Sequence, residues 1–179
     1  MKNVIIISSS PRKKGNSDLL CDEFLKGAKS AGHKVEKIFL KDKKINFCTG
    51  CDFCVKKNFT TCSQKDDMKE ILEKMISADV IVFATPIYFY TISGQLKTLI
   101  DRMSARYAYI KNKEFFYIFT AQEDNKNAIK YALGELKGLM ANLEKPKQKG
   151  YLFAGGVWHK GEVKNTPFMK KAFEFGKSI

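Results

Sequence analysis

The sequence predicts an α/β fold, a doubly wound parallel sheet with helices on both of its faces. Short apolar segments alternate with amphipathic segments along the chain of 179 residues, as expected when each strand is followed by a helix that packs on the sheet. Segments 4–7 and 80–84 are apolar at nearly every position, which is typical of strands buried on both faces. Hydrophobic residues make up 44% of the chain, enough for one compact core.

Each element is predicted from its own pattern. Runs of apolar, β-branched or aromatic residues indicate strands, and stretches with helical apolar spacing indicate helices. Segment 41–65 has neither pattern, and a loop of this length inside a compact domain usually has a function. We therefore expect one domain over residues 1–179, with a cysteine-rich loop inserted at about 41–65. The predicted strands are 4–7, 35–40, 80–84, 115–120 and 151–154, and the predicted helices are 17–30, 66–77, 93–104, 125–143 and 167–177.

The chain is strongly basic, with 32 Lys and Arg against 19 Asp and Glu and a formal net charge of +13. These cations form either a solvated lysine-rich surface or a field that attracts anionic ligands, cofactor phosphates foremost. Nucleic acid is not expected as a partner, because no recognised binding motif accompanies the charge. No apolar run approaches the roughly 18 residues that cross a bilayer, and no signal peptide is visible. We expect a cytoplasmic protein without membrane segments.

The first apolar segment runs straight into hydroxyl groups and positive charge. In an open parallel sheet, ligands bind beyond the carboxyl ends of the strands, which is where Ser8, Ser9 and Ser10 lie. Asn16 or Ser17 can cap a helix whose free N–H groups point back into this loop, as in many anion sites. A serine-rich turn with no ligand is the alternative. The loop matches neither G-x-x-x-x-G-K-[ST] nor G-x-G-x-x-G, which argues against a nucleotide triphosphatase or a Rossmann dehydrogenase.

Two segments resemble a known family. Residues 8–17, SSSPRKKGNS, resemble the phosphate loop G-S-P-R-x-x-G-N-[ST] of the flavodoxin-like NAD(P)H-dependent FMN reductases and iron-sulfur flavoproteins, with Ser9 in place of the usual glycine. Residues 78–90, followed by GQLK at 94–97 and by Asp101 and Arg102, resemble the family's P-[IV]-Y segment and L-K-x-x-x-D-R helix. The resemblance covers most of the chain. It implies five strands in the order 2-1-3-4-5, a bound FMN, and NAD(P)H as the electron donor.

The same resemblance implies a role for each loop. The first loop would bind the FMN phosphate, and the segment after the third strand would line the isoalloxazine ring, for which aromatic side chains offer flat apolar surface. Loop 120–125 would meet the ring from the other side. From the residues alone, the aromatics at 88–90 could equally serve core or interface packing, and 122–124 could be a polar loop with helix-capping acids. The candidate cofactor-binding residues are Ser8, Ser9, Ser10, Pro11, Arg12, Asn16, Ser17, Pro86, Ile87, Tyr88, Phe89, Thr120 and Ala121.

No side-chain catalyst is nominated. The histidines are His33 and His159, and no set of nucleophile, base and orienting residue emerges around them. Hydride transfer from nicotinamide to flavin depends on stacking and alignment more than on a protein acid or base. We expect His33 to lie in a surface turn. His159 follows Trp158 in a loop that either covers the flavin or lies exposed at the surface.

Four of the five cysteines, Cys48, Cys51, Cys54 and Cys62, lie close together in the long loop. Three thiolates spaced by three residues, with a fourth further along, can ligate an iron-sulfur cluster. Zinc and free or redox-active thiols are the alternatives. The run resembles the compact motif of the iron-sulfur flavoproteins, which implies a [4Fe-4S] cluster near FMN. The fifth cysteine, Cys21, is expected to be a buried small hydrophobic residue.

Three functions are compatible with the sequence. The first is an enzyme in which NAD(P)H reduces bound FMN, which then reduces a small-molecule acceptor such as a quinone, an azo or nitro compound or free flavin. The second is an electron-transfer protein that takes electrons from ferredoxin through the cluster to FMN. The third is a binding module that uses the cysteine loop as a zinc knuckle. Resemblance to the flavodoxin-like reductases also implies a homodimer or homotetramer, with Phe89, Tyr90, Trp158 and segment 107–109 as candidate interface aromatics.

Overall fold

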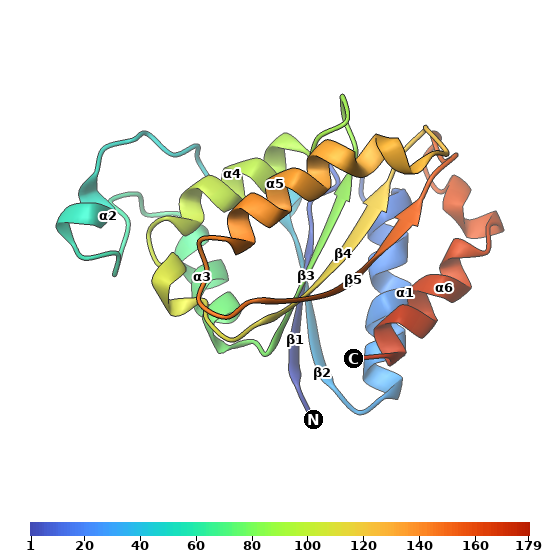
Figure 1. The fold of residues 1–179 in the computed structure, drawn as a ribbon, viewed down its shortest axis with the longest axis horizontal. Helices are drawn as coiled ribbons and strands as arrows, with labels where there is room; N and C mark the ends of the chain where they lie inside the picture. Colours follow the sequence, from blue (N-terminus) through green and yellow to red (C-terminus); the bar gives the residue numbers. More distant parts are fainter.

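The computed structural model describes residues 1–179 and has a five-stranded sheet at its centre (Figure 1). The strand order is β2-β1-β3-β4-β5, which confirms the fold class and the order expected from the sequence. Each neighbouring pair is parallel, so all five strands end at the same edge of the sheet. The strands are β1 (Asn3–Ser8), β2 (Lys34–Phe39), β3 (Val80–Pro86), β4 (Glu114–Thr120) and β5 (Lys147–Ala154).

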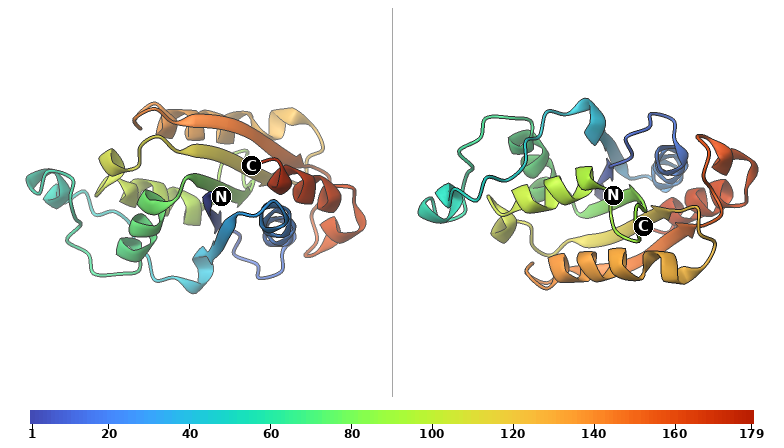
Figure 2. Two further views of the ribbon diagram at one scale, coloured as in Figure 1. Left: turned by 90° about the horizontal axis from the view of Figure 1, so that it is seen from below. Right: turned by 90° about the horizontal axis from the view of Figure 1, so that it is seen from above.

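Helices cover both faces of this sheet (Figures 1 and 2). Successive residues of a strand point to opposite faces, so Ile5 and Ile7 pack into one apolar core while Val4 and Ile6 pack into the other. The core around Val4 is covered by α1 (Asn16–Ser30) and α6 (Phe168–Lys177). The core around Ile5 is covered by α3 (Met68–Ser77), α4 (Gly94–Met103) and α5 (Lys130–Met140).

Two elements differ most from their sequence-based boundaries. β5 begins at Lys147, because its polar first half pairs with β4 as an edge strand, where side chains can face water; the pairing register shifts between Phe115 and Phe116. The expected helix 125–143 consists of a 3-10 turn (Lys126–Ile129) followed by α5. Asn125 caps the start of that turn by accepting a hydrogen bond from the Asn127 N–H at 3.0 Å.

Segment 41–65 is mostly irregular, with one helical turn, α2 (Phe53–Lys56). It extends away from the sheet beyond α3 and α4 (Figures 1 and 2). Short 3-10 turns occur at Leu40–Asp42, Tyr107–Tyr109 and Glu162–Asn165. None of the helices combines the length and the apolar character needed to cross a bilayer.

Candidate functional site

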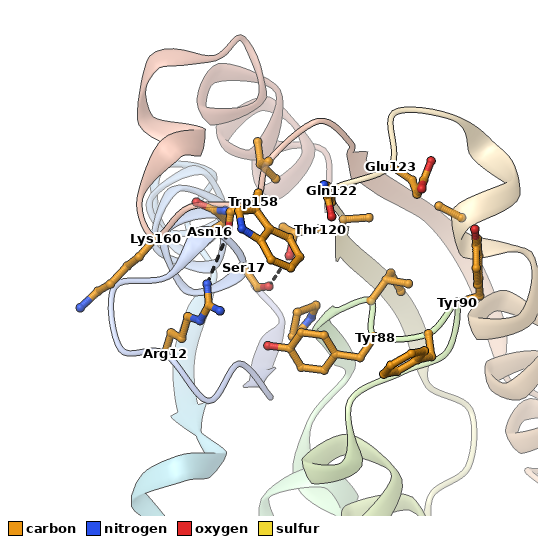
Figure 3. Close-up of a pocket in the computed structure, with 16 residues that line it drawn as sticks. Arg12, Asn16, Ser17, Tyr88, Tyr90, Thr120, Gln122, Glu123, Trp158 and Lys160 are labelled. Carbon is orange, nitrogen blue, oxygen red and sulfur yellow. Dashed lines mark hydrogen bonds between the residues drawn. The ribbon is translucent and has the colours of Figure 1, made fainter.

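A cleft lies at the carboxyl edge of the sheet, where the loops after β1, β3, β4 and β5 meet (Figure 3). Its volume is about 500 Å³, which is within the range of small-molecule and cofactor sites. Aromatic, charged and small polar side chains share its wall. Of the residues expected from the sequence, those that line the cleft are Arg12, Asn16, Ser17, Pro86, Ile87, Tyr88, Phe89, Thr120 and Ala121.

The cleft also has lining residues that were not among the candidate cofactor-binding positions. Gln122 and Glu123 belong to loop 120–125, which was expected to meet the ring, and Trp158 belongs to a loop that was expected either to cover the flavin or to lie exposed. Ala128 and Lys160 belong to no recognisable motif, and only the folded chain brings them to the cleft. The additional lining residues are Tyr90, Gln122, Glu123, Ala128, Val157, Trp158 and Lys160.

The serine hydroxyls of the first loop are turned inward, and residues 8–11 do not line the cleft. Ser9 Oγ donates to the Ala84 carbonyl oxygen at 2.9 Å and is 2.9 Å from Ser93 Oγ, which donates to it. Ser10 Oγ accepts a hydrogen bond from the N–H two residues further on. These hydroxyls therefore hold the loop in shape and tie it to the start of α4, rather than facing a ligand.

The N-terminus of α1 supplies the hydrogen-bond donors at the first loop. α1 begins at Asn16, after Gly15, and no side chain caps it. The N–H groups of its first turn thus have no partner within the helix, which makes this end a ready anion site. Gly15 is needed here because a Cβ would lie 2.8 Å from the Arg12 carbonyl oxygen. The exposed side chain of Arg12 adds positive charge at the wall of the cleft.

The segment after β3 is fixed to its neighbours before it turns into the cleft. The Ile87 N–H donates to the Thr120 carbonyl oxygen at 2.8 Å, which continues the pairing of β3 with β4. Thr85 Oγ1 accepts from the Ser93 N–H at 2.9 Å, and the Glu135 carboxylate of α5 accepts from the Ile92 N–H at 3.0 Å. Both ends of the turn are therefore held by buried or half-buried polar groups.

The turn itself carries aromatic residues in a strained backbone. Tyr88 and Thr91 exchange both of their backbone hydrogen bonds, and the two residues between them, Phe89 and Tyr90, have φ of +49° and +66°. Residues other than glycine seldom adopt this region, and such strain is concentrated at functional sites. The Phe89 side chain at the tip is 97% exposed, so it is available to a ligand or to another chain.

Trp158 projects over the cleft from the loop after β5 (Figure 3). The Glu162 carboxylate accepts from the N–H groups of His159 at 2.9 Å and Trp158 at 2.7 Å, and these hydrogen bonds lower the pKa of Glu162. The first loop holds the same segment, since Arg12 Nη1 donates to the Trp158 carbonyl oxygen and Asn16 Nδ2 donates to the His159 carbonyl oxygen. At Trp158 and His159 only backbone atoms are engaged in these hydrogen bonds, which leaves the indole free to face a ligand.

Cys21 and His33 both lie outside the cleft. Cys21 is completely buried in the core, where burial raises the pKa of its thiol to about 12; the sequence-based expectation for it is confirmed. His33 is half-buried rather than exposed, and its Nδ1 accepts from the Lys2 N–H at 3.1 Å. It therefore helps to hold the turn before β2.

The four cysteines of the long loop are not assembled into one site. Cys48 and Cys51 are exposed, and Cys54 and Cys62 are half-buried. Nowhere in residues 1–179 do three His, Cys, Asp or Glu side chains stand close enough to hold a metal ion together. A hydrogen bond with Ser63, together with nearby backbone N–H groups, lowers the pKa of the Cys51 thiol to about 7. The donor chemistry suits a cluster, but this arrangement of the thiols does not form one.

A buried ion pair anchors the cysteine loop to α4. Arg102 Nη1 lies 2.7 Å from Asp66 Oδ2, and Arg102 Nη2 lies 3.0 Å from Asp66 Oδ1; the two side chains are only 1% and 4% exposed. Arg102 also donates to the Asn46 carbonyl oxygen at 2.8 Å and to Cys62 Sγ at 3.5 Å. Asn46 and Asp66 stand at the two ends of the loop, so one arginine fixes both ends.

A parallel sheet in this order, with a helix N-terminus open to the first loop and an aromatic cleft at its carboxyl edge, defines the flavodoxin-like class of α/β proteins. Within that class the chain belongs to the NADPH-dependent FMN reductase family, a family of oxidoreductases, which it matches over residues 2–141.

Several curated relatives of the chain are named iron-sulfur flavoproteins. The chain is 38% identical over 164 residues to an iron-sulfur flavoprotein of Archaeoglobus fulgidus, an alignment that covers 86% of this chain and 80% of the relative. It is also 38% identical over 96 residues to an iron-sulfur flavoprotein of Methanosarcina thermophila, covering 54% of this chain and 49% of that one. The chain thus spans about half the length of several curated relatives that it matches.

Solved structures share the fold at low sequence identity. An NAD(P)H:quinone oxidoreductase from Methanothermobacter marburgensis superposes with a TM-score of 0.78 and 18% identity, covering 99% of this chain and 95% of that one. An azoreductase from Bacillus anthracis superposes with a TM-score of 0.74 and 15% identity, covering 100% of both chains. Likeness at this identity establishes the fold alone.

Proposed function

We propose that the protein is an FMN-dependent NAD(P)H oxidoreductase that passes electrons to a small-molecule acceptor. The observation that carries the proposal is the cleft in which an uncapped helix N-terminus, Arg12 and an aromatic turn come together at the carboxyl edge of the sheet. Membership of the NADPH-dependent FMN reductase family supports the cofactor. Structural neighbours named quinone oxidoreductase and azoreductase support a quinone or an azo compound as the acceptor.

The residues present fit FMN at both of its ends. The phosphate would accept hydrogen bonds from the first-turn N–H groups of α1, with Arg12 offsetting its charge. The ring would lie against segment 86–88 and Thr120, with Trp158 above it. The volume of about 500 Å³ suits a ligand of this size.

When bound, FMN would supply the hydride and electron transfer that no side chain of the cleft can perform. The chain's own residues bind and orient. Tyr88 and Trp158 would provide aromatic surface to a ring, and the hydrogen-bonded turn after β3 would hold Tyr88 against it.

The proposal is tested by the spectrum of the anaerobically purified protein. We expect flavin absorption bands, or their appearance when FMN is added, and bleaching of these bands by NADH or NADPH in stopped-flow experiments. Negligible reduction by both nicotinamides would reject the reductase. A colourless protein that binds no FMN would favour a binding module instead.

The Trp158 side chain is expected to contribute to FMN affinity through stacking. Trp158→Leu should raise the Kd for FMN by about three- to tenfold, as expected for the loss of one aromatic contact. The loop should stay in place because its hydrogen bonds involve backbone atoms. Flavin fluorescence quenching measures the Kd. Tyr131→Leu is the matched control, since Tyr131 is similarly exposed at 59% but lies outside the cleft; an equal loss in both variants would contradict stacking at Trp158.

A second candidate function is supported by the cysteine loop and by the relatives named iron-sulfur flavoprotein. In this case the loop would hold a [4Fe-4S] cluster, with ferredoxin as the electron source. The four thiols of the loop do not converge in the structure. Homodimer or homotetramer formation likewise stays a prediction, for which the exposed Phe89 offers an apolar contact.

Iron analysis separates the two candidates. If the loop is a cluster site, the protein reconstituted anaerobically with iron and sulfide should contain about four of each per chain and show broad absorption beyond the flavin bands. Cys54→Ser should remove that iron, whereas Cys21→Ser should leave it bound, because Cys21 lies in the core. Zinc bound in place of iron, or no metal at all, would reject the cluster and leave FMN binding unaffected.

A further inference from the structure

A carboxylate is buried directly beneath the first loop. Asp18, the third residue of α1, is 4% exposed. It accepts a hydrogen bond from the Lys14 N–H at 2.9 Å and a longer one from Ser8 Oγ at 3.4 Å. Lys14 has a φ of +56°, in the region that residues other than glycine seldom adopt. The Asp18 carboxylate therefore holds the loop in the turn that exposes the N-terminus of α1.

This placement creates an electrostatic conflict. The first turn of α1 is where a phosphate would bind, and a phosphate monoester carries nearly two negative charges at neutral pH. A buried carboxylate within that turn repels the anion, and the repulsion is strong because a buried charge is poorly screened. The charge of Asp18 has to be offset if its position is to be compatible with phosphate binding.

Lys37 offsets this charge from the neighbouring strand. Its Nζ on β2 lies 2.8 Å from Asp18 Oδ1, and the side chains are 20% and 5% exposed. It also bonds Asp22, whose side chain is 43% exposed and therefore partly screened by water. Although burial opposes the charged form, the hydrogen bonds to the two carboxylates raise the pKa of Lys37. The thiol of Cys21 nearby is neutral, because burial raises its pKa to about 12.

We propose that Lys37 is a positioning residue for anion binding: it neutralises Asp18, so that Asp18 can hold the Lys14 turn without repelling a phosphate group at the first loop. The inference rests on the proposed function for the identity of the ligand, but the role of Lys37 concerns the phosphate alone. Lys37 does not line the cleft, and it acts on the ligand only through Asp18.

The test compares FMN with riboflavin, which lacks the phosphate. Lys37→Met should weaken FMN binding by about tenfold or more, the scale of one uncompensated charge near an anion, and change riboflavin binding by less than about twofold. The double variant Lys37→Met/Asp18→Asn should recover most of the FMN affinity, because asparagine can still accept from the Lys14 N–H. Lys34→Met removes an exposed lysine of the same strand and is expected to leave both affinities unchanged.

The outcomes distinguish a role in charge balance from a role in folding alone. Equal weakening of FMN and riboflavin by Lys37→Met, or no recovery in the double variant, would overturn the proposal. Inorganic phosphate, measured by calorimetry, is the second probe. If the protein binds phosphate but not FMN, the proposed function fails, and the effect of Lys37→Met on phosphate affinity decides the inference. If the wild-type protein binds neither probe, both proposals are wrong.

Discussion

Arg102→Met is expected to destabilise the folded protein by about 3–5 kcal/mol, the usual cost of leaving one partner of a buried ion pair alone. Asp66 would remain buried without its cation, and the Asn46 carbonyl oxygen would lose its donor. Chemical denaturation measures the change. Because Arg102 fixes both ends of the cysteine loop, limited proteolysis should also cut within segment 47–65 faster in the variant.

Two further variants make this result specific. Lys97→Met breaks an exposed i,i+4 pair with Asp101 on the same helix and should cost no more than about 0.5 kcal/mol. Arg102→Met/Asp66→Asn should recover part of the loss, since no buried charge is left unpaired. A loss of less than about 1 kcal/mol in the free energy of unfolding of Arg102→Met would contradict the prediction, because it would mean that water screens the Arg102–Asp66 pair.

The Arg102–Asp66 pair also predicts a dependence of stability on pH. Burial of the Asp66 carboxyl opposes ionisation, but the hydrogen bonds from Arg102 and from backbone N–H groups outweigh it and lower the pKa of Asp66. A lowered pKa in the folded state means that the stabilisation is complete above the ordinary aspartate pKa and is lost as the pH falls through the lowered value. The acid sensitivity of Arg102→Met should therefore be smaller than that of the wild-type protein.

Gly27→Ala is expected to destabilise the fold by about 3 kcal/mol or more, at the upper end of overpacking effects. A Cβ on Gly27 of α1 would lie 1.9 Å from the Phe173 carbonyl oxygen of α6, and a Cβ on Gly176 of α6 would lie 2.0 Å from the Phe24 carbonyl oxygen of α1. These neighbours are backbone atoms, so no rotamer change relieves the clash and the helices must move apart. Thermal unfolding and denaturant titration measure the effect, and Gly176→Ala should behave alike.

Gly134→Ala in α5 is the matched control. Gly134 is also inside a helix, but nothing lies within 4 Å of the position of its Cβ. Alanine there should stabilise the protein by about 0.5–1 kcal/mol through helix propensity alone. If Gly27→Ala lowered the free energy of unfolding no more than Gly134→Ala does, α1 and α6 would not approach each other as closely as the structure indicates.

Whether a strand could be predicted from the sequence depends on its position in the sheet. β1 and β3 are central strands buried on both faces, which leaves a continuous apolar signal. The first half of β5 is an exposed edge with polar residues, so its sequence resembles that of a loop. Gly27 and Gly176 could not be interpreted from the sequence, because glycine within a helix usually indicates weak helix formation. The close crossing of α1 and α6 explains why each of these positions is glycine.

The location of the candidate site followed from topology, but the direction of its side chains did not. Parallel strands end at one edge, so the segments after β1, β3 and β4 had to meet there. The Ser9 hydroxyl was expected to face a phosphate, yet it bonds Ser93, which is 84 residues away in the sequence. No local pattern carries information about that partner.

By itself, then, the sequence determined the alternation of strands and helices, the order of the sheet through family resemblance, and the loops that form the cleft. Tertiary structure alone decided which polar groups of those loops are engaged with one another, that Arg102 closes the cysteine loop, and that Lys37 offsets Asp18. The physical reason is that apolar periodicity is a local property of the sequence, whereas the partner of a charge or a hydroxyl is set by distances between elements far apart in the chain.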